Sequence, residues 1–219
     1  MDTIKQQKSL TEQTYSILLD AICSGEMEPG KRLNQDEIAA SLSVSRQPVN
    51  NAISVLKANG FVQDTGRRGV VVSHISVDQF LSIYEFRSAI EPFAVRLAHE
   101  RKPPEAATQA ADIMKRGFAA AKLDNARAQI DIDFEFHAML YKWAGNPTIA
   151  NTMHVNWHHI RRSMGVVVRR GVIAQTSWDE HAQIIEALLN EDVVTAEAAM
   201  THHIESAQNK TLNLIKTNT

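Results

Sequence analysis

The 219-residue chain has one cysteine, Cys23, and no run of eighteen or more apolar residues. A single cysteine excludes a framework of intramolecular disulfides and is typical of a reducing compartment. An apolar run of that length is what a membrane-spanning helix requires, and the N-terminus lacks the basic-then-apolar pattern of a signal peptide. We therefore expect a cytoplasmic protein with no membrane partner, in which Cys23 is a small core residue.

The chain also has little net charge, because 23 Lys and Arg oppose 25 Asp and Glu, for a net of -2 at pH 7. The overall composition thus gives no sign of a nucleic-acid-binding protein. Residues 31–68 differ from the rest, with a local charge of +3. Three acidic residues in this stretch, Asp36, Glu37 and Asp64, stand against Lys31, Arg32, Arg46, Lys57, Arg67 and Arg68. A one-sided basic patch of this kind is sufficient for phosphate contacts.

Two short helices around a turn are predicted within this basic stretch. Asn34 and Glu37 have the spacing of a capping box, which predicts that a helix begins there. Ser45 is placed to cap a second helix, and Pro48 falls in its first turn, where proline is tolerated. Asn59–Gly60 is a typical helix end. This pattern is typical of a DNA-binding helix-turn-helix, whose second helix enters the major groove.

A β-ribbon is predicted directly after these helices. Phe61–Val62 and Val70–Val72 are short apolar strands around a glycine-bearing turn, so residues 1–75 form a winged helix-turn-helix. The candidate DNA-contacting residues are Arg32, Ser45, Arg46, Gln47, Asn50, Arg67, Arg68 and Gly69. The alternative for any one charged residue is a solvated surface, but the motif favours DNA contact. Gly69 in addition lets the backbone approach DNA closely.

Residues 76–219 show only helical periodicity, so the fold class is mainly α, with an all-helical antiparallel bundle as the second domain. The DNA-binding domain is predicted to begin with a helix at 10–23, and a polar linker at 73–76 connects it to the bundle. The predicted helices of the bundle are 77–101, 104–122, 126–144, 148–169, 177–190 and 192–215. Ser177 and Glu180 have capping-box spacing, which predicts the start of the fifth helix of the bundle.

Four polar residues lie on apolar stripes of these helices. Asp133 and His137 are one turn apart on one predicted helix, and His181 and His203 lie on two others. A lone histidine on an apolar face is usually a hydrogen-bonded core residue. Three histidines and a carboxylate that can face one bundle interior instead favour a metal site. Imidazole with carboxylate suits Zn²⁺, Ni²⁺, Mn²⁺ or Fe²⁺.

The first domain contains a series of motifs in a fixed order, which are Gly25-x-x-x-Pro29-Gly30-x-x-Leu33, Ile38-Ala39, Val44-Ser45-Arg46-x-Pro48-Val49, Leu56-x-x-x-Gly60 and Gly69-x-x-Val72. In these motifs it resembles the DNA-binding domain of the GntR family of transcriptional regulators. One departure is the pair Asn50-Asn51, where the family usually has Arg-Glu. This difference affects which operator sequence is read and leaves the fold unaffected.

Residues 77–210 resemble the helical effector domain of the FCD branch of the same family. The motifs are Asp133-x-x-x-His137, Glu180-His181 and a histidine 22 residues further on, His203. The resemblance implies that Asp133, His137, His181 and His203 bind a divalent transition metal. It also implies that the domain binds a small carboxylic acid.

Arg87 lies on the apolar stripe of the first bundle helix, and two interpretations are open. It can form a salt bridge to Glu91, one turn away, or it can form a two-pronged contact with a carboxylate ligand. We favour the second, because the family's effector domains typically have an arginine for their acid at this position.

The function expected is that of a regulator, not an enzyme. It would bind double-stranded operator DNA as a homodimer and respond to a small carboxylic acid. One alternative is a metal-dependent hydrolase fused to a DNA-binding domain, although the sequence contains neither HExxH nor a nucleophile elbow. The other is a regulator that senses the metal itself. Ile113 and Phe118 are apolar residues that could contribute to the dimer interface.

Overall fold

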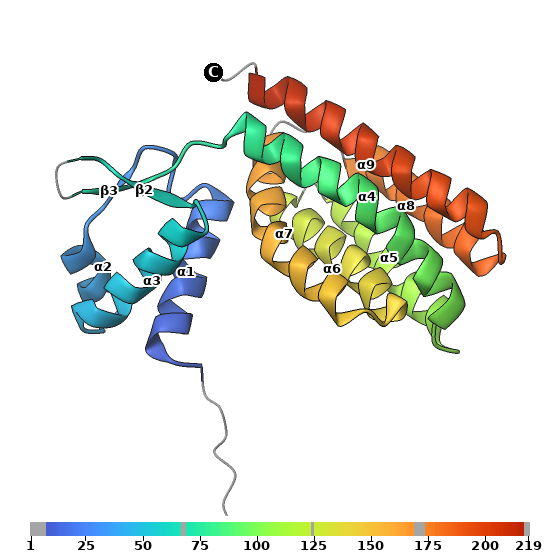
Figure 1. Cartoon of the computed structure of the whole chain (residues 1–219), viewed down its shortest axis with the longest axis horizontal. Coiled ribbons are helices and arrows are strands. Elements are labelled where there is room, and N and C mark those ends of the chain that lie inside the picture. The colour runs from blue at the N-terminus through green and yellow to red at the C-terminus, as the bar shows by residue number, and fades with distance from the viewer. Residues whose placement is uncertain (1–7, 67–68, 124, 169–173, 217–219) are drawn as a thin grey trace, which may run out of the picture. The chain divides into compact units, whose positions relative to one another are not determined.

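The computed structural model describes residues 8–66, 69–123, 125–168 and 174–216 (Figure 1). The chain divides into two compact units, Met1–Ile75 and Ser76–Thr219. The first combines short helices with a small sheet, and the second is helical in its described part, so the predicted fold class is confirmed. No helix in these ranges is both long and apolar enough to cross a membrane.

The first unit contains α1 (Leu10–Ser24), α2 (Gln35–Ser41) and α3 (Arg46–Ala58). The predicted start of α2 is confirmed, because the Asn34 side-chain oxygen accepts hydrogen bonds from the backbone N–H groups of Asp36 and Glu37. Ser45 does occupy the N-cap position of α3, but its side chain makes no capping hydrogen bond. The three helices share one core, in which Val49 and Leu56 are completely buried and Cys23 lies as expected.

The sheet of the first unit has three strands, β1 (Arg32–Leu33), β2 (Val62–Asp64) and β3 (Val70–Val72). Their order is β1-β3-β2, and both pairings are antiparallel. The ribbon of β2 and β3 was predicted. β1 was not, because two residues are too few to show an alternating pattern. It matters for function, since pairing with β3 holds Arg32 beside the wing.

The second unit is the predicted bundle. Its helices are α4 (Val77–Arg101), α5 (Ala106–Lys122), α6 (Ala126–Ala144), α7 (Pro147–Val168), α8 (Ala174–Leu189) and α9 (Val193–Lys216). The predicted capping box of the fifth bundle helix was wrong. Ser177 does not cap the fifth helix of the bundle, because α8 already includes it, and the Glu180 carboxylate contacts His203 instead.

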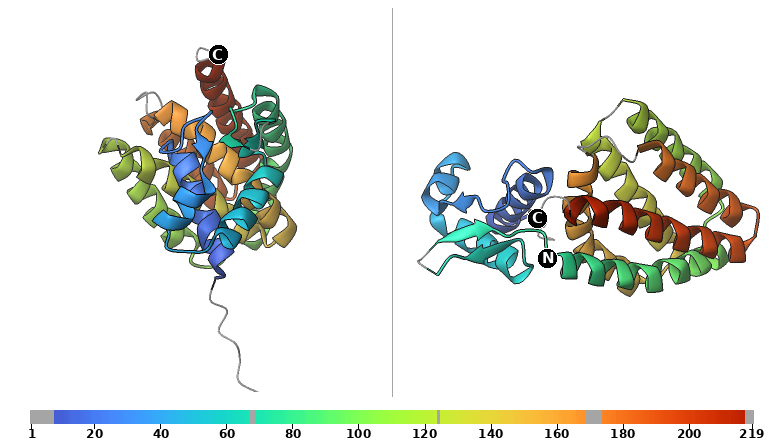
Figure 2. Two further views of the ribbon diagram at one scale, coloured as in Figure 1. Left: turned by 90° about the vertical axis from the view of Figure 1, so that its left-hand side faces the viewer. Right: turned by 90° about the horizontal axis from the view of Figure 1, so that it is seen from above.

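Helix packing in this unit brings α4, α6, α8 and α9 around one interior. α4 packs along α9 and α6, and α8 packs along α9 (Figure 2). α5 lies against α6 and α8. This packing corrects the suggestion that Ile113 lies on an outer surface, whereas Phe118 is half-buried and its part in a dimer interface stays a prediction. Ile113 is a buried residue of α5, and the Phe118 ring lies 6.4 Å from the Trp178 ring of α8.

Candidate functional site

The basic groups expected to contact DNA come together beside α2 and α3. Arg32, Arg46 and Gly69 line one surface groove of about 520 Å³, together with residues 34–37 at the start of α2. Ser45 and Gln47 are exposed next to Arg46, and Asn50 is half-buried one turn further along α3. Arg67 and Arg68 lie outside the described residues. In a winged helix-turn-helix the second helix, here α3, enters the major groove, and side chains beside it contact phosphates.

Arg46 is held in this groove by an acidic neighbour. Its Nε lies 3.0 Å from Oδ1 of Asp36, and both side chains are exposed. In the part of the chain that the structure describes, the two terminal amino groups of Arg46 make no hydrogen bond. They therefore remain available for a guanine edge or a phosphate. Directly after Arg46, Gln47 donates a hydrogen bond of 3.0 Å to Asn51 on the next turn, which fixes a polar pair on the exposed face of α3.

Gly69 is required by the wing turn itself. A Cβ atom at this position would lie 2.6 Å from Oγ1 of Thr65, which is closer than real Cβ contacts. The Thr65 backbone N–H and hydroxyl both donate to the Gly69 carbonyl, at 2.9 and 3.2 Å. The sequence analysis gave a different reason for a glycine at this position, namely that it lets the backbone approach DNA closely.

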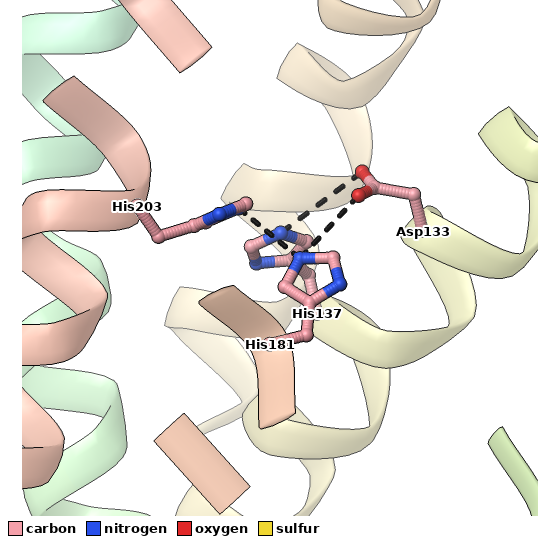
Figure 3. A group of neighbouring side chains, drawn as sticks. All are labelled: Asp133, His137, His181 and His203. Atoms are coloured by element: carbon pink, nitrogen blue, oxygen red, sulfur yellow. Dashed lines mark hydrogen bonds and ion pairs between the residues drawn. The ribbon is translucent and has the colours of Figure 1, made fainter. Parts of the chain in front are cut away.

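Four polar side chains converge inside the bundle of the second unit (Figure 3). Asp133 and His137 come from α6, His181 from α8 and His203 from α9, and all four are buried. One nitrogen or carboxylate oxygen from each lies within 4.8 Å of the others. Nε2 of His181 is 3.1 Å from Nε2 of His203 and 3.5 Å from Oδ1 of Asp133. The structure thus brings together all four residues that the sequence analysis singled out.

His203 is oriented by an acidic partner. Its Nδ1 lies 2.9 Å from Oε2 of Glu180, whose other oxygen accepts hydrogen bonds from Ser206 and Lys210 at 2.7 and 3.2 Å. An ionised carboxylate only accepts, so the His203 proton lies on Nδ1 and the Nε2 lone pair points into the cluster. This is the usual arrangement around a metal-binding histidine.

His137 has a similar acidic neighbour. Its Nδ1 lies 2.7 Å from Oε2 of Glu91, although the N–H direction departs from the ideal line between them. Its Nε2 is buried, 4.0 Å from Asp133, and has no hydrogen-bond partner among the described residues. A buried imidazole nitrogen without a partner costs free energy unless something binds to it. The four residues therefore fit a divalent transition metal, which their donor set also suits.

Burial keeps the imidazoles of His181 and His203 neutral, the form that binds a metal. It lowers the pKa of His181 well below its ordinary value, and the neighbouring His203 and His137 lower it further. Burial also lowers the pKa of His203, and Glu180 offsets this only in part. The Glu180 carboxyl remains ionised. Burial raises its pKa, but hydrogen bonds from His203 and Ser206 outweigh burial and bring it to about 2.

His181 is held by aromatic packing. The Phe136 ring stacks on it at 4.0 Å, and the Trp178 ring meets it edge-on at 4.8 Å. Trp178 in turn occupies the space over Gly117, where a Cβ atom would come within 2.3 Å of the indole ring. The His181 Nδ1 is buried and has no hydrogen-bond partner within the described ranges. Its position is thus fixed by shape, in contrast with the other two histidines.

Arg87 makes the salt bridge that was the alternative interpretation. Its Nε lies 2.5 Å from Oε1 of Glu91, and both side chains are buried. Its guanidinium carbon lies 4.9 and 5.8 Å from the ring centres of Tyr84 and Trp157. Burial would raise the pKa of Glu91, but Arg87 and His137 outweigh it and hold the pKa below its ordinary value. Over the described residues, the two terminal amino groups of Arg87 form no hydrogen bond, so they can still bind a carboxylate.

Sequence reasoning missed the role of four residues around the cluster. Glu91 entered only as the salt-bridge partner of Arg87, and Glu180 only as a motif residue and a cap. Trp178 entered only as an apolar residue flanking His181 on the same predicted helix, and Gly117 was not connected to His181 at all. The contacts of Glu91 with His137 and of Glu180 with His203 join different helices, so no local spacing reports them.

Comparison with known proteins agrees with this architecture. Residues 10–72 match the family described as bacterial regulatory proteins, gntR family, and residues 82–206 match the FCD domain. The Nta operon transcriptional regulator of Aminobacter aminovorans is 25% identical over 88% of this chain and 90% of its own length. The HTH-type transcriptional repressor RspR of Escherichia coli is 28% identical over 90% of this chain and 86% of its own length.

Solved structures show the same fold. E. coli McbR/YncC superposes with a TM-score of 0.80 at 18% identity and covers 97% of this chain and 99% of its own. A transcriptional regulator from Rhodococcus sp. RHA1 gives a TM-score of 0.79 at 23% identity, over 93% of this chain and 97% of its own. The family match extends across both units and agrees with their geometry. The chain therefore belongs to the GntR family of bacterial transcriptional regulators, as a DNA-binding protein with an FCD domain as its second unit.

Proposed function

We propose that this regulator senses a small organic acid, which binds at a divalent transition metal in the second unit and changes affinity for operator DNA. The observation that carries the proposal is the pairing of two buried features. Asp133 and the three histidines converge on one point. Arg87, also buried, keeps its terminal amino groups without partners among the described residues.

The metal would be held by Asp133, His137, His181 and His203. Zn²⁺, Ni²⁺, Mn²⁺ and Fe²⁺ all accept this donor set. The bound metal would supply a localised positive charge that an anion can neutralise. Four protein ligands leave about two positions of a six-coordinate ion for oxygen atoms from another molecule. A carboxylate oxygen suits such a position.

Arg87 would bind the same acid through a second contact. Glu91 engages only Nε of the guanidinium. The terminal amino groups lie on the other edge and match the two oxygens of a carboxylate. Tyr84 and Trp157 flank the guanidinium and limit its movement, so less conformational entropy is lost when an anion binds.

The acid would be linked to DNA binding through α4. This helix begins at Val77, next to the first unit, and it carries Arg87. A ligand held by both Arg87 and the metal ties α4 to α6, α8 and α9. A small displacement of a packed helix is a common means of switching between two states. We expect a homodimer on a near-palindromic operator, because a two-fold symmetric dimer presents one recognition helix to each of two half-sites.

Two relatives support repression as the mode of action. RspR is named a transcriptional repressor, and a protein of Paenarthrobacter nicotinovorans is named a probable D-xylose utilization operon transcriptional repressor. The matched relatives named as regulators support a regulator here and give no support to the hydrolase alternative. A sensor of the metal alone would use the same four ligands but would leave the terminal amino groups of Arg87 without a role.

A thermal-shift screen tests the proposal. The full chain, treated with chelator and then given Zn²⁺ or left without it, is heated with a panel of small carboxylic acids. At least one acid should raise the melting temperature when Zn²⁺ is present, and less or not at all without it. Arg87→Ala should abolish this acid-dependent shift. A melting temperature that responds to Zn²⁺ but to no acid would favour a metal sensor.

A further inference from the structure

Glu91 touches both parts of the proposed effector site. Its Oε1 accepts from Nε of Arg87 at 2.5 Å, and its Oε2 lies 2.7 Å from Nδ1 of His137. The side chain of Glu91 is completely buried. Within the residues that the structure describes, neither Oε2 of Glu91 nor Nδ1 of His137 makes a hydrogen bond of good geometry, and the Tyr141 hydroxyl is a further neighbour of Glu91. We propose that Glu91 is a positioning residue that fixes the tautomer of His137 and links Arg87 to the metal centre.

The tautomer follows from which atoms can donate. A carboxylate paired with a guanidinium is ionised and only accepts, so the facing Nδ1 of His137 must carry the proton. The opposite tautomer would place a nitrogen lone pair against a carboxylate oxygen at 2.7 Å in a buried site. With the proton on Nδ1, the lone pair of Nε2 faces Asp133. A small rotation of the ring would align the N–H with Glu91.

The link to Arg87 follows because Arg87 and His137 share the carboxylate of Glu91. This part of the inference rests on the proposed function. A cation on Nε2 withdraws electrons from the imidazole and makes Nδ1–H a stronger donor. Glu91 would then bind His137 more tightly and Arg87 less tightly. The guanidinium becomes more available to an incoming anion, so the metal prepares Arg87 for the acid.

Glu180 offers a matched control. It contacts His203 through one oxygen, at 2.9 Å, as Glu91 contacts His137. Its other oxygen bonds to Ser206 and Lys210, with no contact to Arg87. Glu180→Gln should therefore disturb one metal-binding histidine without disturbing the link to Arg87.

The experiment is NMR of full-length protein with ¹⁵N-labelled histidine and arginine, titrated with Zn²⁺ alone. In metal-free wild type, His137 should carry its proton on Nδ1. In Glu91→Gln the amide oxygen would accept from Arg87 and the amide NH₂ group would donate to Nδ1 of His137. The imidazole proton of His137 should therefore move to Nε2. Zn²⁺ affinity, measured by calorimetry, should fall about 10–100-fold in both Glu91→Gln and Glu180→Gln. Zn²⁺ should shift the Arg87 Nε–H resonance in wild type and Glu180→Gln but not in Glu91→Gln.

A His137 proton on Nε2 in wild type would overturn the inference, and that measurement needs no variant. An unchanged His137 tautomer and an unchanged Zn²⁺ affinity in Glu91→Gln would also overturn it. So would an Arg87 Nε–H resonance in wild type that does not shift when Zn²⁺ binds. Wild type that takes up no Zn²⁺ would contradict the proposed function instead. In that case the metal-free tautomer still decides the role of Glu91.

Discussion

Nε2 of His181 lies 3.1 Å from Nε2 of His203, although the two residues come from different helices and are 22 positions apart. His203 has its proton on the far nitrogen, facing Glu180, so its near nitrogen is an acceptor. His181 can donate a hydrogen bond to this nitrogen only if its own proton lies on Nε2. A cation bound between the two nitrogens would replace this hydrogen bond. This pair of nitrogens is the geometric basis of the proposed metal site.

The first prediction is that His181→Ala loses both metal and stability. Metal binding to the folded chain adds to its stability, so removing one ligand removes part of that contribution. Elemental analysis should show less bound transition metal, and chelator should no longer lower the melting temperature. His202→Ala, an exposed neighbour of His203, is the control and should change the free energy of unfolding by less than about 0.5 kcal/mol. Equal metal content in His181→Ala and wild type would contradict the ligand assignment.

The second prediction concerns the support of His181. Gly117→Ala forces a methyl group into the Trp178 ring, which packs against His181. Overpacking of this kind costs about 1–3 kcal/mol. Zn²⁺ affinity should fall as well, because the displaced indole releases His181. Lys115→Ala, on the exposed side of the same helix, should alter neither property. Normal Zn²⁺ affinity in a destabilised Gly117→Ala would mean that Trp178 does not position His181.

The third prediction is that Arg46→Ala weakens operator binding. The loss should be about 1–3 kcal/mol if Arg46 reads a base. If it contacts phosphate, affinity should instead fall for all sequences and the salt dependence should become shallower. Fluorescence anisotropy at several salt concentrations separates these outcomes. Arg96→Ala, an exposed charge in the second unit, is the control. An operator titration identical to wild type would remove Arg46 from the interface.

The fourth prediction concerns Asp36, which holds Nε of Arg46. Asp36→Asn removes a negative charge from the groove and loosens the orientation of Arg46. Affinity for non-specific DNA should rise, because phosphate repulsion falls. The ratio of operator to non-specific affinity should fall, because the guanidinium is less ordered. A ratio that stays constant while both affinities rise would show that Asp36 acts only through its charge.

The fifth prediction is that Arg87→Ala loses the response to acid. The substitution also leaves Glu91 buried without its partner, which costs about 3–5 kcal/mol. Metal should still bind, because Asp133 and the three histidines remain in place. Arg87→Lys keeps the charge and loses the planar pair of donors, so it should be more stable and still respond poorly to acid. A full acid response in Arg87→Lys would show that charge alone recognises the ligand.

Much of this arrangement could be predicted because it depends on local patterns. α4 and α6 begin and end where the helical periodicity placed them. The spacing of Asp133 and His137 by one helical turn indicated a shared site. The apolar stripes that carry His181 and His203 indicated two further residues of that site, and the resemblance to the FCD domain implied the same four ligands. The structure brings all four together.

The remainder depends on contacts between elements that are distant in sequence. The fit of Trp178 over Gly117 exists only once α5 packs on α8. The link from Glu91 to His137 likewise requires α4 beside α6. Ser177 shows the opposite error. Its spacing to Glu180 suggested a cap, but α8 starts earlier and Glu180 binds His203.

The most direct test of the account is an operator titration of wild type and His181→Ala, with elemental analysis of the purified, unchelated proteins. Wild type should contain a transition metal, and an acid identified by thermal shift should change its operator affinity only while that metal is bound. His181→Ala should have little metal and no response to the acid. A wild-type protein without any transition metal, together with an undiminished acid response in His181→Ala, would contradict the central claim.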